Sequence, residues 1–236
     1  MRFILLMIGL FSASASSVVW SADEGPWSGS AALGYLATSG NADNTSANGN
    51  FKLGYDSGSW HHGLEARAVG SSTDNATTAE AYGINAQSKY DLSEFNYVFG
   101  LLDWKKDRFS GYDQQTSEQV GYGRRILNTE RHVWNAEIGA GARQSDLRDG
   151  TSQDETTVRV ATDYVWNFSE TGEFGQALIV ESGSVNTFFE SVSAIKATLV
   201  GNVALVASYT IRHNSSVPAG SEKQDTFTAL SLEYSF

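Results

Sequence analysis

Apolar and polar residues alternate one by one along much of the chain. In residues 45–56, Phe51, Leu53 and Tyr55 alternate with polar or small neighbours. Because successive side chains of a β-strand point to opposite faces, this period of two predicts a strand with one apolar and one polar face. A helical spacing of apolar residues fits none of the alternating segments. The pattern recurs in residues 155–168, 203–213 and 225–236.

Turn-forming residues interrupt the alternation at intervals that predict roughly twelve strands, mostly of about 10–14 residues. Short breaks, such as the one at Asp56–Ser59, alternate with breaks that are often longer and more polar, such as Asp146–Asp154 and Asn214–Lys223. An even number of antiparallel strands with alternately short and long connections is typical of a bacterial outer-membrane barrel. The short breaks would then be periplasmic turns, and the longer ones would be extracellular loops.

The N-terminus has the features of an export signal. Arg2 precedes an apolar run at residues 3–11, and Ala13-Ser14-Ala15 provides small residues at a cleavage site. The run is shorter than the roughly 20 residues of a membrane-spanning helix. The sequence therefore predicts a signal peptide at 1–15, with the cut at Ala15 or as late as about residue 22, then a periplasmic segment at 16–26 and a barrel at 27–236.

Alternation alone does not say whether the apolar face of each strand packs inward or faces lipid. A soluble lipocalin-like barrel buries it, whereas an outer-membrane barrel turns it outward around a polar lumen. Export, strands longer than the usual 5–6 residues, and aromatic residues beside the short breaks favour the membrane barrel. A soluble periplasmic barrel that binds a small ligand is the alternative. The aromatic residues expected in the interfacial belt are Trp27, Tyr55, Trp60, Tyr90, Phe95, Tyr97, Tyr122, Trp134, Trp166, Phe168, Phe174, Tyr234 and Phe236.

The chain ends on an aromatic residue inside a strand. Leu230, Leu232, Tyr234 and Phe236 occupy alternate positions up to the last residue. A terminal Phe in this setting resembles the signal that the barrel assembly machinery of the outer membrane recognises. We therefore expect this machinery, together with outer-membrane lipid, as partners of the chain.

Composition excludes several other classes of protein. The net charge of −11 argues against a nucleic-acid-binding surface, and the absence of cysteine rules out disulfides and thiolate metal sites. Aromatic residues make up 12% of the chain, which argues against disorder. No motif calls for a cofactor, and no feature fixes the oligomeric state.

Several short motifs resemble the YdiY-like family of salt-induced outer-membrane proteins, which is defined by a domain of unknown function. They are Gly34-Tyr35-Leu36 with Thr38–Asn41, Tyr97–Gly100, Asp107–Tyr112 and Gly121–Arg124. The resemblance extends over residues 27–236. It implies an outer-membrane location and a link to salt or envelope stress, and it brings no catalytic signature.

The polar face of the predicted strands should line the lumen. Twelve strands imply a backbone radius of roughly 12 Å, which lies between filled eight-stranded barrels and open porins. The mixture of charges predicts a cross-paired wall with at most a narrow pore, or a lumen in which the charges only satisfy each other. The residues that alternation places inside are Lys52, Glu65, Arg67, Lys89, Arg125, Glu137, Arg143, Arg159, Asp163, Glu181, Arg212, Asp225 and Glu233.

Catalytic and metal sites have weak support in the sequence. His213 and Ser215 form a His-x-Ser pair that could serve an outer-membrane hydrolase of the lipase type, but no oriented third group or oxyanion hole accompanies them. His61 and His62 are adjacent in a predicted strand, so their side chains should point to opposite faces. We predict neither an enzyme nor a metal site.

Two further expectations concern single positions. Glu80 and Glu118 fall on the outward face, so that either their strand ends lie above the hydrocarbon or a bulge shifts the register there. Val160 should face lipid, and Val160→Arg should therefore be costly, whereas a substitution of the inward Arg159 should affect stability much less.

Overall fold

The computed structural model describes residues 25–38, 44–74, 76–107, 112–217 and 222–236. All of the regular secondary structure in these residues is β-strand. No helix in this part of the chain is long and apolar enough to cross a membrane. The predicted signal peptide at 1–15, and the predicted periplasmic segment at 16–26 up to residue 24, lie outside the described residues.

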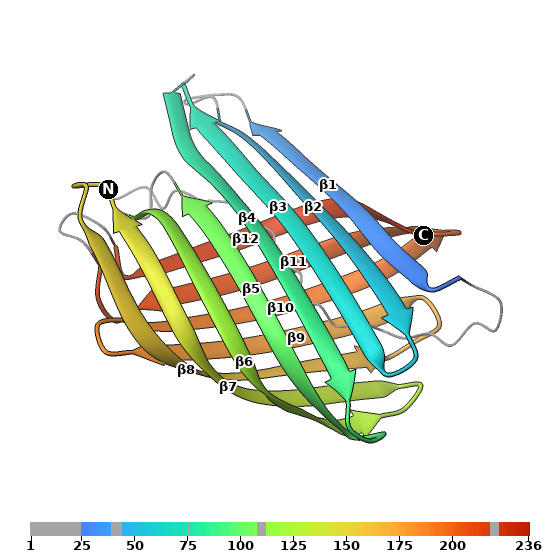
Figure 1. Cartoon of the computed structure of the whole chain (residues 1–236). Coiled ribbons are helices and arrows are strands. Elements are labelled where there is room, and N and C mark those ends of the chain that lie inside the picture. Colours follow the sequence, from blue (N-terminus) through green and yellow to red (C-terminus); the bar gives the residue numbers. More distant parts are fainter. Residues whose placement is uncertain (1–24, 39–43, 75, 108–111, 218–221) are drawn as a thin grey trace.

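The strands form one closed antiparallel barrel in which every strand pairs with its neighbours in sequence and β1 pairs with β12 (Figure 1). This confirms the predicted fold. The strands are 12 to 17 residues long, and several exceed the expected length. They are β1 (Trp27–Thr38), β2 (Asn44–Ser57), β3 (Trp60–Thr73), β4 (Ala76–Asp91), β5 (Asn96–Asp107), β6 (Tyr112–Asn128), β7 (His132–Leu147), β8 (Ser152–Asn167), β9 (Gly172–Gly183), β10 (Thr187–Val200), β11 (Val203–Asn214) and β12 (Gln224–Ser235).

The two ends of the barrel differ in their connections. The end that carries the C-terminus has tight turns, and Gly58 and Gly201 adopt φ of 60° and 53° there, a left-handed conformation that glycine reaches without steric cost. At the opposite end the longest connection is 215–223, whereas 74–75 is as short as any turn. We call these the turn end and the loop end of the barrel.

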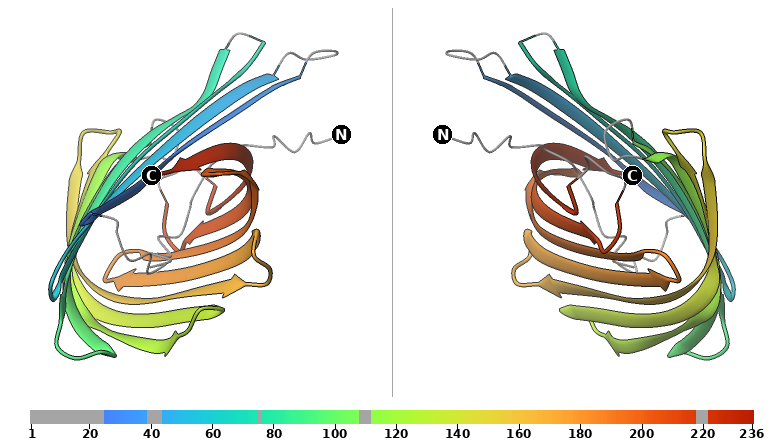
Figure 2. Two further views of the ribbon diagram at one scale, coloured as in Figure 1. Left: turned by 90° about the vertical axis from the view of Figure 1, so that its right-hand side faces the viewer. Right: turned by 90° about the vertical axis from the view of Figure 1, so that its left-hand side faces the viewer.

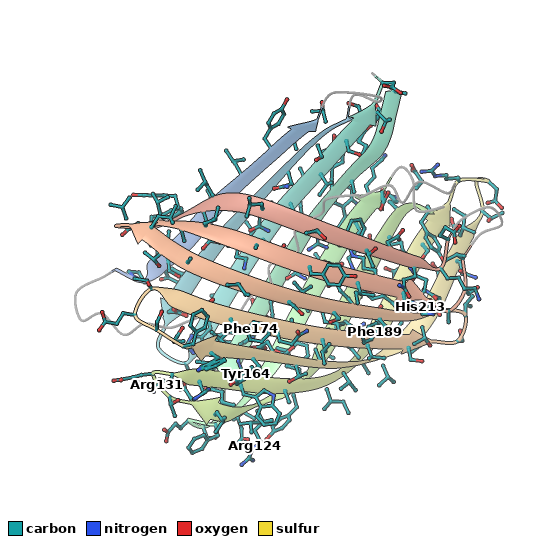
Figure 3. The ribbon with its side chains drawn as sticks, turned by 180° about the vertical axis from the view of Figure 1, so that it is seen from behind. Arg124, Arg131, Tyr164, Phe174, Phe189 and His213 are labelled. Carbon is teal, nitrogen blue, oxygen red and sulfur yellow. The ribbon has the colours of Figure 1, made fainter. Side chains whose placement is uncertain are left out.

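The outer wall is apolar and carries an aromatic rim at the turn end. Val160 is 52% exposed although it is an aliphatic residue in mid-strand. Trp27 packs on Tyr55 with ring centroids 4.6 Å apart, and Trp60 packs on Tyr90 at 4.9 Å. Figure 3 shows Arg131, Tyr164 and Phe174 near this end, and Phe189 and His213 toward the other.

The prediction that Tyr97 belongs to the aromatic rim is wrong. Tyr97 is 1% exposed and donates a hydrogen bond from its hydroxyl to Glu137 on the lumen side. Its strand, β5, begins at Asn96. Tyr97 pairs with Asp91 of β4, and both side chains point into the lumen. Tyr97 is therefore a lumen residue, as is Phe99, two positions further along the same face.

The two outward glutamates keep their outward positions. Glu118 is exposed and pairs in unbroken register with Leu102 and Ala142. The bulges of β6 lie elsewhere, so the bulge explanation is wrong for Glu118. Glu80 accepts a hydrogen bond from the hydroxyl of Tyr82, which lies on the same outer face.

The seam between the first and last strands is short. β1 and β12 share four register pairs, from Ser30 with Ser235 to Leu33 with Leu232. By contrast, β1 pairs with β2 along its whole length. Figure 2 shows β1, in blue, diverging from β12, in red, as the strands leave the C-terminal end.

A charged lumen as the candidate functional site

Alternation along each strand places the candidate residues. The inward face of β8 carries Glu155, Thr157, Arg159 and Ala161, all of them buried, while Val158 and Val160 between them are exposed to the outside. The same parity applies on the other strands because their registers are continuous over most of their length. The residues that the structure places on the lumen side include all of the predicted candidates: Lys52, Glu65, Arg67, Lys89, Arg125, Glu137, Arg143, Arg159, Asp163, Glu181, Arg212, Asp225 and Glu233.

The centre of the lumen is organised around the carboxylate of Glu137 on β7. Arg159 Nη1 lies 2.8 Å from Glu137 Oε2, and Lys89 Nζ lies 3.2 Å from Glu137 Oε1. The Tyr97 hydroxyl and the Gln87 amide also donate to Oε1, at 3.0 and 3.3 Å. Since β4 and β7 are not neighbours, these contacts cross the lumen rather than follow the wall.

Arg143 forms a second cluster nearer the loop end. Its Nε donates to Glu155 Oε1 at 2.9 Å, and its Nη1 donates to Glu181 Oε1 at 3.0 Å. Glu155 also accepts the backbone N–H groups of Val185 and Asn186. The cluster thus ties β7, β8 and β9 to the connection between β9 and β10, which fixes that connection over the lumen.

A third cluster lies on β3, β4 and β5. Asp103 pairs with Lys105 at 2.9 Å and with Arg67 at 3.4 Å, and it accepts a hydrogen bond from Asn85. The ammonium group of Lys105 also lies 4.8 Å from the ring centroid of Phe188 on β10. Because β5 and β10 are on opposite sides of the barrel, Lys105 bridges the lumen there.

Smaller ion pairs complete the lumen. Lys196 binds Glu233 at 2.6 Å, and Arg212 binds Glu190 at 2.8 Å. At the mouth of the turn end, Arg125 Nη2 lies 2.7 Å from Asp91, whose other oxygen lies 3.0 Å from a ring nitrogen of His61. Acidic and basic groups are therefore mixed at every level.

Several lumen residues were absent from the sequence-based set, notably Asp103, Lys105, Glu190 and Lys196. Glu190 and Lys196 are both even-numbered on β10 and share its inward face. The signal was present but weak, because Ser191 and Ser193 make the outward face of β10 polar as well. A strand that is polar on both faces gives no alternation to read.

The three clusters border a small space in the lumen. A cavity of about 120 Å³ lies among the clusters and is lined by residues of β3, β4, β5 and β7 to β10. This volume holds a few waters. It is below the roughly 300 Å³ at which pockets for small molecules begin. The space beside the clusters is therefore polar and of the size of a few waters.

The same contacts correct the expectation for Arg159. Its guanidinium is buried and paired with Glu137, and its removal leaves a buried carboxylate with fewer partners. Such a loss costs about 3–5 kcal/mol in buried pairs. A substitution of Arg159 should therefore affect stability as much as one of Val160, for a different reason.

The hydrolase arrangement does not form among the described residues. The Ser215 hydroxyl donates to Asn186 Oδ1 at 3.3 Å and accepts the N–H of Thr187 at 2.8 Å, so it is engaged away from His213. His61 and His62 point to opposite faces, as predicted: His62 is on the outer wall, 2.9 Å from the Ser88 hydroxyl. No group of three or more potential metal ligands occurs in the described part of the chain.

Known proteins resemble this chain in sequence and in fold. A family model described as "Protein of unknown function, DUF481" matches residues 31–236. The uncharacterised protein YdiY of Escherichia coli (strain K12) is 29% identical over 211 residues, which cover 89% of this chain and 83% of that protein.

Solved structures share the barrel. The NanC porin has a TM-score of 0.51 at 10% identity, covering 87% of this chain and 97% of that one. The COG4313 outer membrane channel from Pseudomonas putida F1 has a TM-score of 0.54 at 11% identity, covering 90% and 96%. The KdgM porin has a TM-score of 0.50 at 9% identity, covering 88% and 99%. At such identities the likeness is one of fold.

Proposed function

The chain belongs to the DUF481 family of proteins of unknown function, and from this premise we propose that it is an outer-membrane barrel that forms a narrow channel for water and small ions. The apolar outer wall and the aromatic rim support the membrane location. The fold shared with porins and an outer-membrane channel supports it as well.

The observation that carries the channel proposal is the charged bridge across the lumen. Lys89 and Arg159 reach Glu137 from strands on either side of it, and a cavity of about 120 Å³ lies beside them. Small hydrated ions can pass such side chains one at a time. Larger solutes could pass only if the ion pairs of Glu137 with Lys89 and Arg159 were broken. Because both signs of charge line the passage, strong ion selectivity is not expected.

Planar-bilayer recording of the refolded protein tests the proposal. The wild type should show a small conductance with weak selectivity. Glu137→Gln keeps the size of the side chain but removes the charge that holds Lys89 and Arg159. We expect this variant to conduct more and to favour anions. Glu130→Gln, in the exposed turn between β6 and β7, is the charge-matched control and should behave as the wild type.

A purely structural role is the second candidate, and the dense pairing of Arg143 with Glu155 and Glu181 favours it. Complete electrical silence of both the folded wild type and Glu137→Gln would refute the channel and leave the structural role. The engaged Ser215 hydroxyl argues against a hydrolase.

A link to salt or osmotic stress is part of the proposal and rests on the family resemblance. Immunoblots of the protein in its native host at low and high NaCl concentration test it directly. Equal amounts under both conditions would contradict a salt-induced role without affecting the channel proposal.

A further inference from the structure

The wall of the barrel is incomplete where its first and last strands meet. Beyond Leu33 the remaining part of β1 still pairs with β2, and the Gln224–Ser231 part of β12 pairs with β11, so both stretches are ordered strand. They share no register pair with each other, because the pairing between β1 and β12 ends at Leu33 with Leu232. The two edges form a wedge that opens toward the loop end (Figure 2).

Such a wedge is costly in hydrocarbon unless something polar fills it. Unpaired backbone N–H and C=O groups cost several kcal/mol each in lipid, and open edges persist only where they line water or polar groups. Gly34 marks the point of divergence. A Cβ there would lie 2.5 Å from Asn48 Oδ1 and 2.6 Å from the Leu230 carbonyl oxygen, so the Asn48 amide and the backbone of β12 both pack against Gly34.

Polar side chains that each leave one oxygen without a hydrogen-bond partner lie on the lumen side of this wedge. Ser208 pairs with Ala229, which makes Ser208 and Ser231 diagonal neighbours on one face, roughly 7–8 Å apart. Each of the side chains concerned is more than nine-tenths buried, and each has an oxygen with no hydrogen-bond partner. We call them the seam cluster: Asn48, Asn50, Ser208, Thr210 and Ser231.

Buried polar oxygens are rarely left unpaired, so the seam cluster points to a missing ligand. Its amide and hydroxyl groups are uncharged, and the amide nitrogen of Asn50 already donates to Glu65 Oε1 at 2.6 Å. Amide oxygens accept hydrogen bonds, and hydroxyls both donate and accept them. These groups suit a neutral molecule that carries several hydroxyls.

The outer side of the wedge is apolar. Leu33 is 74% exposed, Tyr35 is 71% exposed and Leu230 is 59% exposed, because all three point away from the lumen. A soluble polyol would gain nothing from these side chains, whereas an acyl or alkyl chain would bury apolar surface against them.

We propose that the wedge between β1 and β12 binds an amphiphile, with its neutral hydroxyl-bearing head at the seam cluster and its apolar tail passing outward between the two strand edges beyond Gly34, beside Tyr35 and Leu230. The head satisfies the orphan oxygens, and the tail lies in the lipid. Binding at this site is independent of conduction through the centre of the lumen. A passage through the wall would give the barrel a lateral route to the outer leaflet.

Radiolabelled 1-monooleoylglycerol is a suitable probe, with the full-length protein purified in lauryldimethylamine oxide, a detergent without hydroxyl groups. Retention of the probe after gel filtration measures binding. The wild type should retain one molecule per barrel, and excess free glycerol should not displace it. Phosphatidylcholine, whose head has no hydroxyl, should be retained far less.

Matched serines separate a role in binding from a role in folding. Ser231→Ala should lower retention about fivefold, as loss of one hydrogen bond implies. Ser117→Ala removes a buried lumen serine that already binds Glu181, and it should retain the probe as the wild type does. A bulky maleimide on Tyr35→Cys should block retention, while the same label on Leu64→Cys should not. The absence of native cysteine makes this labelling specific.

Three results would overturn the proposal. Unchanged retention in Ser231→Ala and Asn48→Ala would show that the cluster does not hold the head. Equal retention of phosphatidylcholine would show that hydroxyls are not recognised. A stable dimer, with a mass of two chains by native mass spectrometry and no bound probe, would show that a second copy seals the seam instead.

Discussion

Val160→Arg is the substitution that most directly tests which face of the barrel meets lipid. Val160 lies in the middle of β8 and is 52% exposed. Its register partners are Ile138 on β7 and Val180 on β9, both on the same apolar outer face. An arginine there finds no carboxylate among its outward neighbours in register.

The structure sets the size of the effect. The nearest polar outward position toward the loop end on β8 is Thr156, roughly 13 Å away along the strand. An arginine at 160 cannot cover that distance without deforming the bilayer. Its cost should therefore be that of a midplane position, about 2–4 kcal/mol. This corresponds to roughly a 30- to 700-fold change in the folding equilibrium.

Reversible urea unfolding in phospholipid vesicles measures this cost, with the fluorescence of Trp134 and Trp166 as the signal. Thr156→Arg is the matched control on the same strand and face. It should cost about 0–1 kcal/mol, because it lies near the polar boundary. If Val160→Arg is neutral, or if the two variants cost the same, the outward assignment of this face is refuted.

Three other predictions follow from single contacts. Arg159→Met should lower the free energy of unfolding by about 3 kcal/mol in the same assay, because it removes a partner of buried Glu137; a neutral result would contradict a buried pair. Gly34→Val should reduce the folded fraction on unheated electrophoresis gels, since its Cβ meets the Leu230 carbonyl, whereas Gly70→Val, with open space around its Cβ, should fold normally. Deletion of Phe236 should impair assembly in cells more than refolding in vitro; equal impairment would assign its whole effect to its two backbone hydrogen bonds with Gly29.

The sequence predicts the strands and their faces well because the period of two is a local property. Each alternating segment, such as residues 45–56, must place its apolar side chains on one face whatever its neighbours are. The wrong prediction for Tyr97 also has a local cause. Tyr97 follows a turn whose length sets the parity of β5, and a shift of one residue there reverses every side chain.

The pairing of charges inside the barrel could not be read from the sequence. Lys89 and Glu137 are far apart in the chain, and they meet only because the barrel wall curves through β5 and β6 and turns the inner faces of β4 and β7 toward each other. The same holds for Lys105 and Phe188. Alternation shows that each of these residues points inward, but it does not give the distance across the lumen or the partner found there.

The sequence by itself determined the strands, the direction in which most side chains point and the mixed charge of the interior, since each depends on neighbours along the chain. Only the tertiary structure decided which charged groups of the lumen pair with one another and that the seam between β1 and β12 is short. Both depend on closure of the barrel, which brings residues from opposite walls and from the two ends of the chain into contact.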